Sequence, residues 1–167
     1  AYPDFLGQTC AEWERAYSPL HSMNLRCCVL RTGIVLSREG GAYAQLARLF
    51  RLGVGAAVGT GRQAMPWIHI NDMARMYLHC IYHPQLQGTF NAVAPEQVSH
   101  FGFCRQLAAS LHRPFFLPRI PTAFLKVVLG ERALLLTEGV YVSGEKIRST
   151  GFQFEYKALQ PALNALA

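Results

Sequence analysis

The sequence predicts an α/β fold, in which a doubly wound parallel sheet is followed by a small, mostly helical C-terminal subdomain. Three observations lead to this prediction. The run Leu25–Leu30 is mainly apolar, which is typical of a parallel strand covered on both faces. Strand-like and helix-like segments then alternate as far as about residue 112, which is the βα order of such a sheet. From Pro118 onward the pattern changes to short helical segments, most of them followed by glycine.

A helix is predicted first. Pro3-Asp4 is a typical helix start, and Ser18-Pro19 is a typical end. Between these pairs, apolar residues recur at i, i+4, i+7 and i+11, so we expect the helix to bury one stripe, formed by Leu6, Cys10, Trp13 and Tyr17. On this stripe, Cys10 is interpreted as a packed thiol rather than a nucleophile.

The strand at Leu25–Leu30 is followed by a Thr-Gly break and a second apolar run that reaches Leu36. Gly40-Gly41 precedes a helix that carries Leu46, Leu49 and Phe50, and residues 53–61 then form a glycine-rich loop. Glycine lets a backbone approach a ligand closely, so this loop is a candidate binding loop.

The next strand is predicted at Trp67–Ile70, with Asn71 as the N-cap of the following helix and His83-Pro84 as its end. A further strand is expected at Thr89–Val93, and then a helix that is capped by Ser99 and runs to about residue 112. We expect the first of these helices to bury Met73, Met76, Tyr77, Cys80 and Ile81, and the second to bury Phe103, Leu107 and Leu111.

The C-terminal part is predicted to contain short helices at 121–129, 131–137, 144–150 and 159–166. We therefore divide the chain into a sheet-containing part, residues 1–117, and a small helical subdomain, residues 118–167.

Length and composition are consistent with one domain, or with the larger part of a bilobed one. The 167 residues are 51% hydrophobic and 16% charged, against roughly 25% charged in an average soluble domain. This imbalance predicts apolar surface that a partner covers. This partner is either an N-terminal half of the same fold or a second copy of the chain. Both would require the same excess of apolar residues, so composition does not distinguish the two partners.

The net charge of +6 comes mostly from arginines scattered singly along the chain. Nucleic-acid binding requires clustered cations, so the pattern argues against it, whereas dispersed arginine suits phosphate or carboxylate recognition. Apolar runs are too short to span a bilayer. The five cysteines lack Cys-x-x-Cys spacing and lie in apolar patterns, which predicts buried free thiols and a cytoplasmic location.

Several motifs resemble the YfcH-type epimerase family, and the resemblance covers nearly the whole chain. They include Cys10-Ala-Glu-Trp-Glu14, Leu30-Arg-Thr-Gly-Ile-Val-Leu36, Gly59-Thr-Gly-Arg-Gln63, Pro66-Trp-Ile-His-Ile-Asn-Asp72 and Gly151-Phe-Gln-Phe154. The resemblance implies an extended short-chain dehydrogenase/reductase with a partial Rossmann-like sheet, of which this chain is the C-terminal half without the N-terminal half.

The resemblance also implies a site. Thr32, Gly33 and Val35 match the loop that borders the nicotinamide of NADP(H) or NAD(H), although a plain strand pair joined by a glycine turn is the alternative interpretation from the residues alone. Trp67 and His69 lie in a segment that resembles the one under the cleft for a small-molecule substrate such as a nucleotide-sugar. Met65-Pro66 takes the place of the arginine that clamps a phosphate there, and Arg62 and Gln63, three or four residues earlier, are the candidates for that contact. His69 in an apolar strand also fits a structural role, and Asp72 is expected to serve the adjoining helix N-terminus.

Two superfamily features are missing from the sequence. Gly59-Thr-Gly61 is followed by Met65-Pro66 rather than a helix, so it fails as a pyrophosphate-binding turn. Tyr-x-x-x-Lys, which allows a phenol to exchange a proton with substrate, does not occur. No catalytic residue is therefore predicted. His79 and His83 have metal-ligand spacing but no third ligand, so no metal is expected. The alternatives are a non-catalytic nucleotide-binding module and a nucleic-acid binder.

Overall fold

The computed structural model describes residues 5–17, 19–20, 23, 25–121 and 139–167. The described chain begins with helix α1, Phe5–Ala16, which is followed by strand β1, Cys28–Thr32, strand β2, Ile34–Leu36, and helix α3, Gly41–Arg51. Strand β3, Trp67–His69, leads directly into helix α4, Ile70–Tyr82. Strand β4, Gly88–Ala92, precedes helix α5, His100–Ser110, and the short α8, Glu145–Arg148, precedes α9, Leu159–Leu166. The predicted helices at 121–129 and 131–137 lie largely or wholly outside the described residues.

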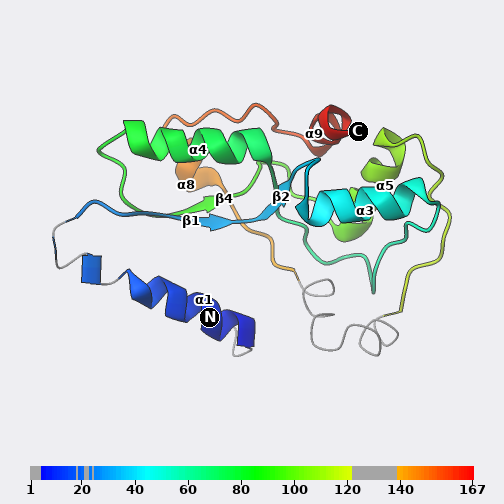
Figure 1. Cartoon of the computed structure of the whole chain (residues 1–167), viewed down its shortest axis with the longest axis horizontal. Helices are drawn as coiled ribbons and strands as arrows, with labels where there is room; N and C mark the ends of the chain where they lie inside the picture. The colour runs from blue at the N-terminus through cyan, green and yellow to red at the C-terminus, as the bar shows by residue number, and fades with distance from the viewer. Residues whose placement is uncertain (1–4, 18, 21–22, 24, 122–138) are drawn as a thin grey trace.

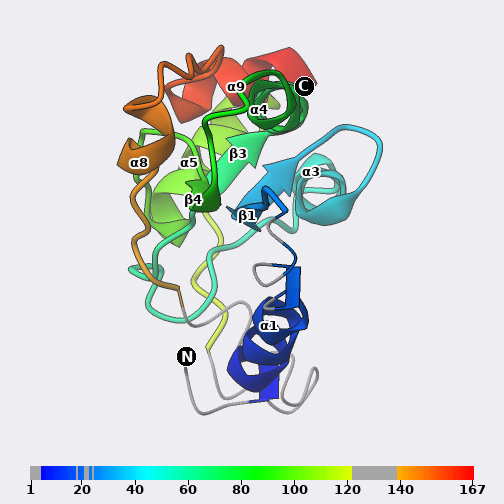
Figure 2. The same ribbon diagram turned by 90° about the vertical axis from the view of Figure 1, so that its left-hand side faces the viewer.

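The strands form two parallel pairs. β1 pairs with β4, with Cys28 beside Gly88, and β2 pairs with β3, with Ile34 beside Trp67. Helices α4 and α1 lie on opposite sides of the β1–β4 pair, as both views show (Figures 1 and 2). The predicted α/β class with parallel strands is therefore confirmed.

Two apolar cores lie on the two faces of the β2–β3 pair. Trp67 belongs to the first core, with residues of α3, α5 and α9, whereas its neighbour Ile68 belongs to the second core, with residues of α4, β4 and α8. Successive side chains of a strand point to opposite faces, so a strand with an apolar core on each side must be apolar throughout. All three residues of β3 are accordingly buried.

β1 differs from the prediction. The strand begins at Cys28, and Leu25 is 52% exposed. Cys28 and Leu30 pack against the second core, but they and Val29 are only partly buried, and Arg31 and Thr32 are exposed. The predicted coverage on both faces is therefore only partial among the described residues. The apolar sequence of β1 indicates more complete burial than the described residues provide.

The first helix also departs from its predicted packing, because Cys10 is exposed and the Trp13 side chain is 65% exposed. On α4, Met73, Met76 and Cys80 are buried as expected, but Tyr77 and Ile81 are 52% and 61% exposed. The predicted thiol burial holds only for Cys80 and Cys104. Cys27 and Cys28 are half-buried, and all five cysteines are free.

The Ser99 cap is confirmed, since its hydroxyl accepts a hydrogen bond from the Gly102 amide at 3.1 Å. The predicted Asn71 cap is wrong. His69 is the N-cap of α4, and its Nδ1 accepts from the Asn71 amide at 3.1 Å. Within the described ranges, no helix has the length and apolarity to cross a membrane.

Candidate functional site

The extended segment 28–36 changes its strand partner at Gly33. The Gly33 amide donates to the Ala92 carbonyl of β4 at 3.1 Å, and the next amide, of Ile34, donates to the Pro66 carbonyl before β3 at 2.8 Å. A side chain does not fit at the change-over. A Cβ on Gly33 would lie 2.8 Å from the Pro66 oxygen and 2.9 Å from Val93 Cγ1. Glycine is therefore required here by close approach.

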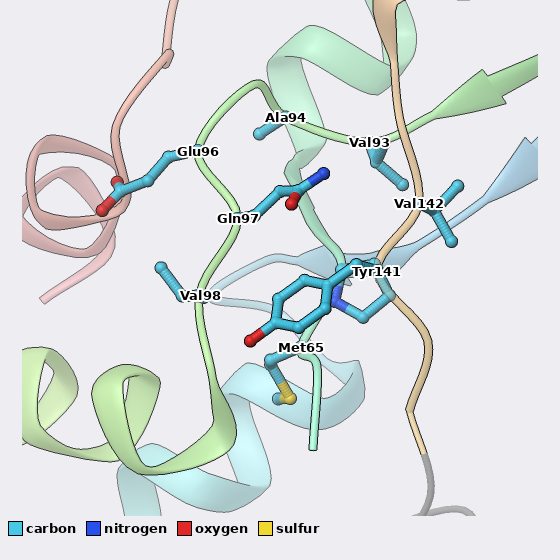
Figure 3. A pocket seen from close by; sticks show the side chains of 9 residues that line it. Met65, Val93, Ala94, Glu96, Gln97, Val98, Tyr141 and Val142 are labelled. Carbon is cyan, nitrogen blue, oxygen red and sulfur yellow. The ribbon is translucent and has the colours of Figure 1, made fainter. Parts of the chain in front are cut away.

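A small cavity lies beside this change-over, between the segment that follows β4 and the segment that enters β3 (Figure 3). Its volume is about 10 Å³, which is room for roughly one water molecule. Met65, Pro66, Val93 and Val142 give it an apolar wall, while Gln97 and the half-exposed Tyr141 bring an amide and a phenol. In parallel α/β sheets, ligands bind outside the carboxyl ends of strands where the strand order changes.

Gln97 and Tyr141 were not predicted from the sequence. The signal for Gln97 is the polar Glu96-Gln97 pair four residues beyond the end of β4, a position where substrate contacts are common. No local signal marks Tyr141, because residues 139–142 are brought to the cavity from a distant part of the chain.

A larger groove lies between α1 and β1. Its volume is about 610 Å³, within the range of roughly 300–1,000 Å³ that is typical of small-molecule sites. Cys10, Glu14 and Tyr17 line it from α1, and Val29, Arg31 and Thr32 line it from β1. Cys10 is therefore exposed at a groove, which corrects its interpretation as a packed thiol.

An ion pair bridges this groove. The Arg31 guanidinium donates from Nε to Glu14 Oε1 at 2.6 Å and from Nη2 to Glu14 Oε2 at 2.7 Å. The hydrogen bond to Arg31 lowers the pKa of the Glu14 carboxyl, and the same bond raises the pKa of Arg31. Both side chains are substantially exposed, so solvent screens the pair and its main effect is to fix α1 beside β1.

The predicted cofactor residues occupy one continuous stretch at the change-over. Thr32 is exposed at the end of β1 and also lines the α1–β1 groove. Val35 is half-buried in β2 and packs against the second core. Thr32 thus lines the groove, and Gly33 follows it at the change-over. There Gly33 lies against Pro66 and Val93, which line the cavity.

The predicted substrate residues are more dispersed. Arg62 is exposed on the glycine-rich loop, and Gln63 Nε2 donates to the Val58 carbonyl within that loop at 3.0 Å. Neither residue lines the cavity or the groove. Trp67 is 1% exposed, and its Nε1 donates to the Glu96 carbonyl at 3.1 Å, so it supports the segment that lines the cavity.

His69 is 3% exposed, and desolvation lowers the pKa of its imidazole, although Asp72 and Glu155 oppose that shift. Its ring packs on Tyr156 with centroids 4.0 Å apart, and Nε2 is buried without a hydrogen-bond partner. With Nδ1 used to cap α4, this histidine fits the structural role that the apolar context indicated.

Asp72 has a role in addition to the predicted one. Its buried carboxylate accepts from the backbone amides of Glu155 and Tyr156 at 2.7 and 2.9 Å, and Arg75 lies 3.3 Å away. Although Asp72 lies in the first turn of α4, its oxygens hold the C-terminal segment rather than only the helix end.

The imidazoles of His79 and His83 lie 4.0 Å apart, centroid to centroid. His79 Nε2 interacts with Thr150 Oγ1 at 3.0 Å, and His83 Nδ1 with the His79 carbonyl at 2.8 Å. Among the residues that the structure describes, no group of three or more His, Cys, Asp or Glu side chains is arranged to hold a metal ion.

Parallel strand pairs, the helices α3 and α4 between β2, β3 and β4, and a change of partner at a close-packed glycine define a partial Rossmann-like α/β protein. Epimerase family protein SDR39U1 of Mus musculus is 38% identical over 161 residues, which are 96% of this chain and 54% of that protein. The crystal structure of the human epimerase family protein SDR39U1 (isoform 2) with NADPH matches with a TM-score of 0.81 and 38% identity, over 85% of this chain and 48% of that one. The nucleoside-diphosphate sugar epimerase from Corynebacterium glutamicum matches with a TM-score of 0.73 and 27% identity, over 96% of this chain and 30% of that one.

Residues 120–166 match a family described as "Domain of unknown function (DUF1731)". The chain belongs to the epimerase family, as its motifs indicated, and corresponds to the C-terminal part of these proteins. It spans about half the length of the curated relatives that it matches.

Proposed function

We propose that this chain forms the nicotinamide-side loop and the substrate cleft of an NAD(P)-dependent nucleoside-diphosphate-sugar epimerase or a related oxidoreductase. The observation that carries the proposal is the change of strand partner at Gly33, with exposed Thr32 beside it and a ligand-sized groove adjoining it. Ligands of parallel α/β folds bind at such places. The NADPH in the human relative's structure supports a nicotinamide cofactor for this family.

The residues at this place fit a nicotinamide. Thr32 is exposed at the end of β1 and carries a hydroxyl, and the close packing of Gly33 against Pro66 and Val93 fixes the backbone beside it. We assign Thr32 and Gly33 to the border of the cofactor and Val35 to the apolar support behind it. A bound nicotinamide supplies hydride transfer, while these residues orient it and exclude water.

For the substrate, we assign Arg62 to phosphate recognition because it is an exposed guanidinium on a glycine-rich loop. We assign supporting roles, without direct substrate contact, to Gln63, Trp67 and His69. Gln63 braces the loop, Trp67 holds the Glu96 segment, and His69 caps α4.

We propose that the pyrophosphate-binding turn comes from outside this chain, because its Gly-x-Gly segments, Gly53-Val-Gly55 and Gly59-Thr-Gly61, both lack the following helix. We therefore propose that function requires the N-terminal half of the fold, in the cytoplasm. The chain alone is expected to bind NADPH weakly or not at all, since it lacks the helix N-terminus that holds the diphosphate.

A non-catalytic nucleotide-binding module is the second candidate function. The observation that favours it is the sequence itself, in which no tyrosine has lysine four residues later. Turnover of a nucleotide-sugar would exclude it, whereas NADPH binding without turnover of any such substrate would favour it.

The test is to titrate NADPH into this chain combined with the N-terminal half of a close relative and to measure the dissociation constant by calorimetry. Thr32→Val keeps the side-chain shape and removes the hydroxyl, so we expect a loss of affinity of about three- to tenfold, the range for one hydrogen bond. Ser149→Ala, which removes the hydroxyl of an exposed serine that lines neither the groove nor the Figure 3 cavity, is the control. Equal affinities in both variants, or no binding by the combined protein, would contradict the proposal.

A further inference from the structure

The positive charge of the chain gathers in the part of the molecule that surrounds the first core. Residues 40–71 and 97–121, which include α3 and α5, contain no aspartate or glutamate. The same two stretches contain six exposed arginines, namely Arg48, Arg51, Arg62, Arg105, Arg113 and Arg119. This excess equals the net charge of +6 of the whole chain. The arginines are scattered along the sequence, but folding places them in one part of the molecule with no carboxylate side chain from either stretch.

Four of these arginines lie where the end of α3 meets the segment that follows α5. Arg48 and Arg51 are in the last turn of α3, and Arg113 and Arg119 are on residues 111–120. The ring of Phe115 packs against that of Phe50 of α3 with centroids 5.9 Å apart, so the two segments are neighbours, at the right-hand end of Figure 1. Among the residues that the structure describes, none of the four arginines forms an ion pair. Their guanidinium groups are therefore available to an external anion.

Large apolar side chains are exposed on the same two segments. Leu52, Val54 and Phe116 are 68%, 54% and 72% exposed. Leu52 follows Arg48 by four residues, a spacing that places both side chains on one side of a helix. The Val54 amide donates to the Leu49 carbonyl at 3.1 Å, which holds the turn after α3 against the helix end. Exposed Leu and Phe beside unpaired cations are typical of a surface that lies in the interface of an anionic membrane.

We infer that this arginine–apolar end, formed by Arg48, Arg51, Leu52, Val54, Arg113, Phe116 and Arg119, is a docking surface for an anionic lipid membrane. The arginines bind the lipid head groups, and the three apolar side chains insert at the boundary with the acyl chains. Charge complementarity requires an anionic occupant, and the apolar side chains favour a lipid surface over a nucleic acid, whose phosphate backbone has no hydrocarbon layer beneath it.

The other exposed apolar face does not combine the two features. Helix α4 exposes Leu78 and Tyr82, but its one arginine, Arg75, lies 3.3 Å from Asp72 and 3.7 Å from Glu155. The membrane surface is also separate from the proposed cofactor and substrate residues, because neither Thr32 nor Arg62 belongs to it. Its test therefore does not depend on NADPH binding.

Flotation of this chain with lipid vesicles tests the electrostatic contact. We expect binding to vesicles of equimolar phosphatidylcholine and phosphatidylserine at physiological ionic strength, little binding to phosphatidylcholine alone, and release at high salt. One arginine near an anionic leaflet contributes about fivefold, so Arg48→Gln combined with Arg113→Gln should weaken binding at least about tenfold.

Arg148→Gln combined with Lys157→Gln is the matched control for this pair. The control removes the same charge from two exposed residues outside the surface, and should leave binding nearly unchanged. An equal loss in both double variants would show a response to overall charge and would overturn the inference. Failure to bind anionic vesicles at physiological ionic strength would overturn it as well.

Substitution of apolar residues tests insertion. Leu52→Ser combined with Phe116→Ser should weaken vesicle binding at least about tenfold, because each buried apolar side chain contributes about that factor. Both residues are mostly exposed, so the variant should fold, which its circular dichroism checks. Leu78→Ser combined with Tyr82→Ser, on α4, is the control and should bind as the parent does. Equal binding of the two double variants would refute insertion.

A fluorescent reporter and a competitor complete the test. Phe116→Trp in a Trp13→Phe background should shift its emission to shorter wavelength on anionic vesicles and be quenched by brominated acyl chains, whereas the buried Trp67 contributes a constant signal. An unshifted, unquenched reporter on bound protein would overturn the inference. Duplex DNA that displaces the chain from vesicles, with an affinity that the Leu52 and Phe116 substitutions do not change, would identify a nucleic acid as the occupant and would also overturn it.

Discussion

Gly33→Ala is the most direct test of the strand change-over. The added Cβ would lie 2.8 Å from the Pro66 oxygen, 2.9 Å from Val93 Cγ1 and 3.2 Å from the Pro66 carbonyl carbon. Two of these three neighbours are backbone atoms, and the Pro66 carbonyl is held by its hydrogen bond from Ile34. The clash therefore cannot be relieved by rotating a side chain.

The expected magnitude follows from two opposing effects. Overpacking of a closely packed site costs about 1–3 kcal/mol of unfolding free energy. Replacing glycine by alanine also restricts the unfolded chain, which stabilises the protein by roughly 0.4–1 kcal/mol. Because the clash involves backbone, we expect the cost to exceed the gain and Gly33→Ala to destabilise the chain by about 1–2 kcal/mol.

Gly102→Ala supplies the control with the opposite sign. Gly102 lies inside α5, where a Cβ would meet only Ser99 Oγ, at 3.4 Å. Alanine in a helix is favoured over glycine by up to about 1 kcal/mol, so this variant should be stabilised. Urea unfolding of both variants measures the difference. If Gly33→Ala proves as stable as Gly102→Ala, the close approach at the change-over is incorrect.

Three further predictions concern the supporting structure. Asp72→Asn should lower the unfolding free energy in urea by about 1–3 kcal/mol, because an amide cannot accept from both backbone amides of the C-terminal segment as the carboxylate does; unchanged stability would contradict this. Burial lowers the pKa of His100 below its usual 6.5, so the folded state favours the neutral imidazole. The unfolding free energy is therefore fully retained above pH 6.5 and falls as the pH drops below that value, because the unfolded state then binds a proton more readily. Urea unfolding between pH 7.5 and 5 should therefore lose less stability in His100→Asn than in the parent or in the exposed-site control His112→Gln, and parallel curves would count against it. In Trp13→Phe the remaining Trp67 should emit at short wavelength and resist iodide quenching, because it is 1% exposed; ready quenching would place it at the surface.

Much of the fold could be predicted because its signals are local. The Ser99 cap, the end of α4 at His83-Pro84 and the glycine break after Thr32 each depend on a few neighbouring residues, and the structure places them as expected. The membership of the epimerase family was likewise contained in short motifs, as the comparison with its relatives confirms.

The sequence by itself determined that the chain alternates strands and helices and that specific faces of α1, α4 and β1 are apolar. Periodicity reports that a face is apolar but not which surface covers it, so Trp13 and Ile81 were expected to be buried and are exposed. Only the tertiary structure decided that His69 caps α4, that Asp72 holds residues 155 and 156, and that Tyr141 meets Gln97 at one cavity. Except for the cap, these contacts join residues far apart in the chain, and even the cap depends on the histidine's conformation at the end of β3. Such contacts arise from packing in three dimensions, which no local pattern encodes.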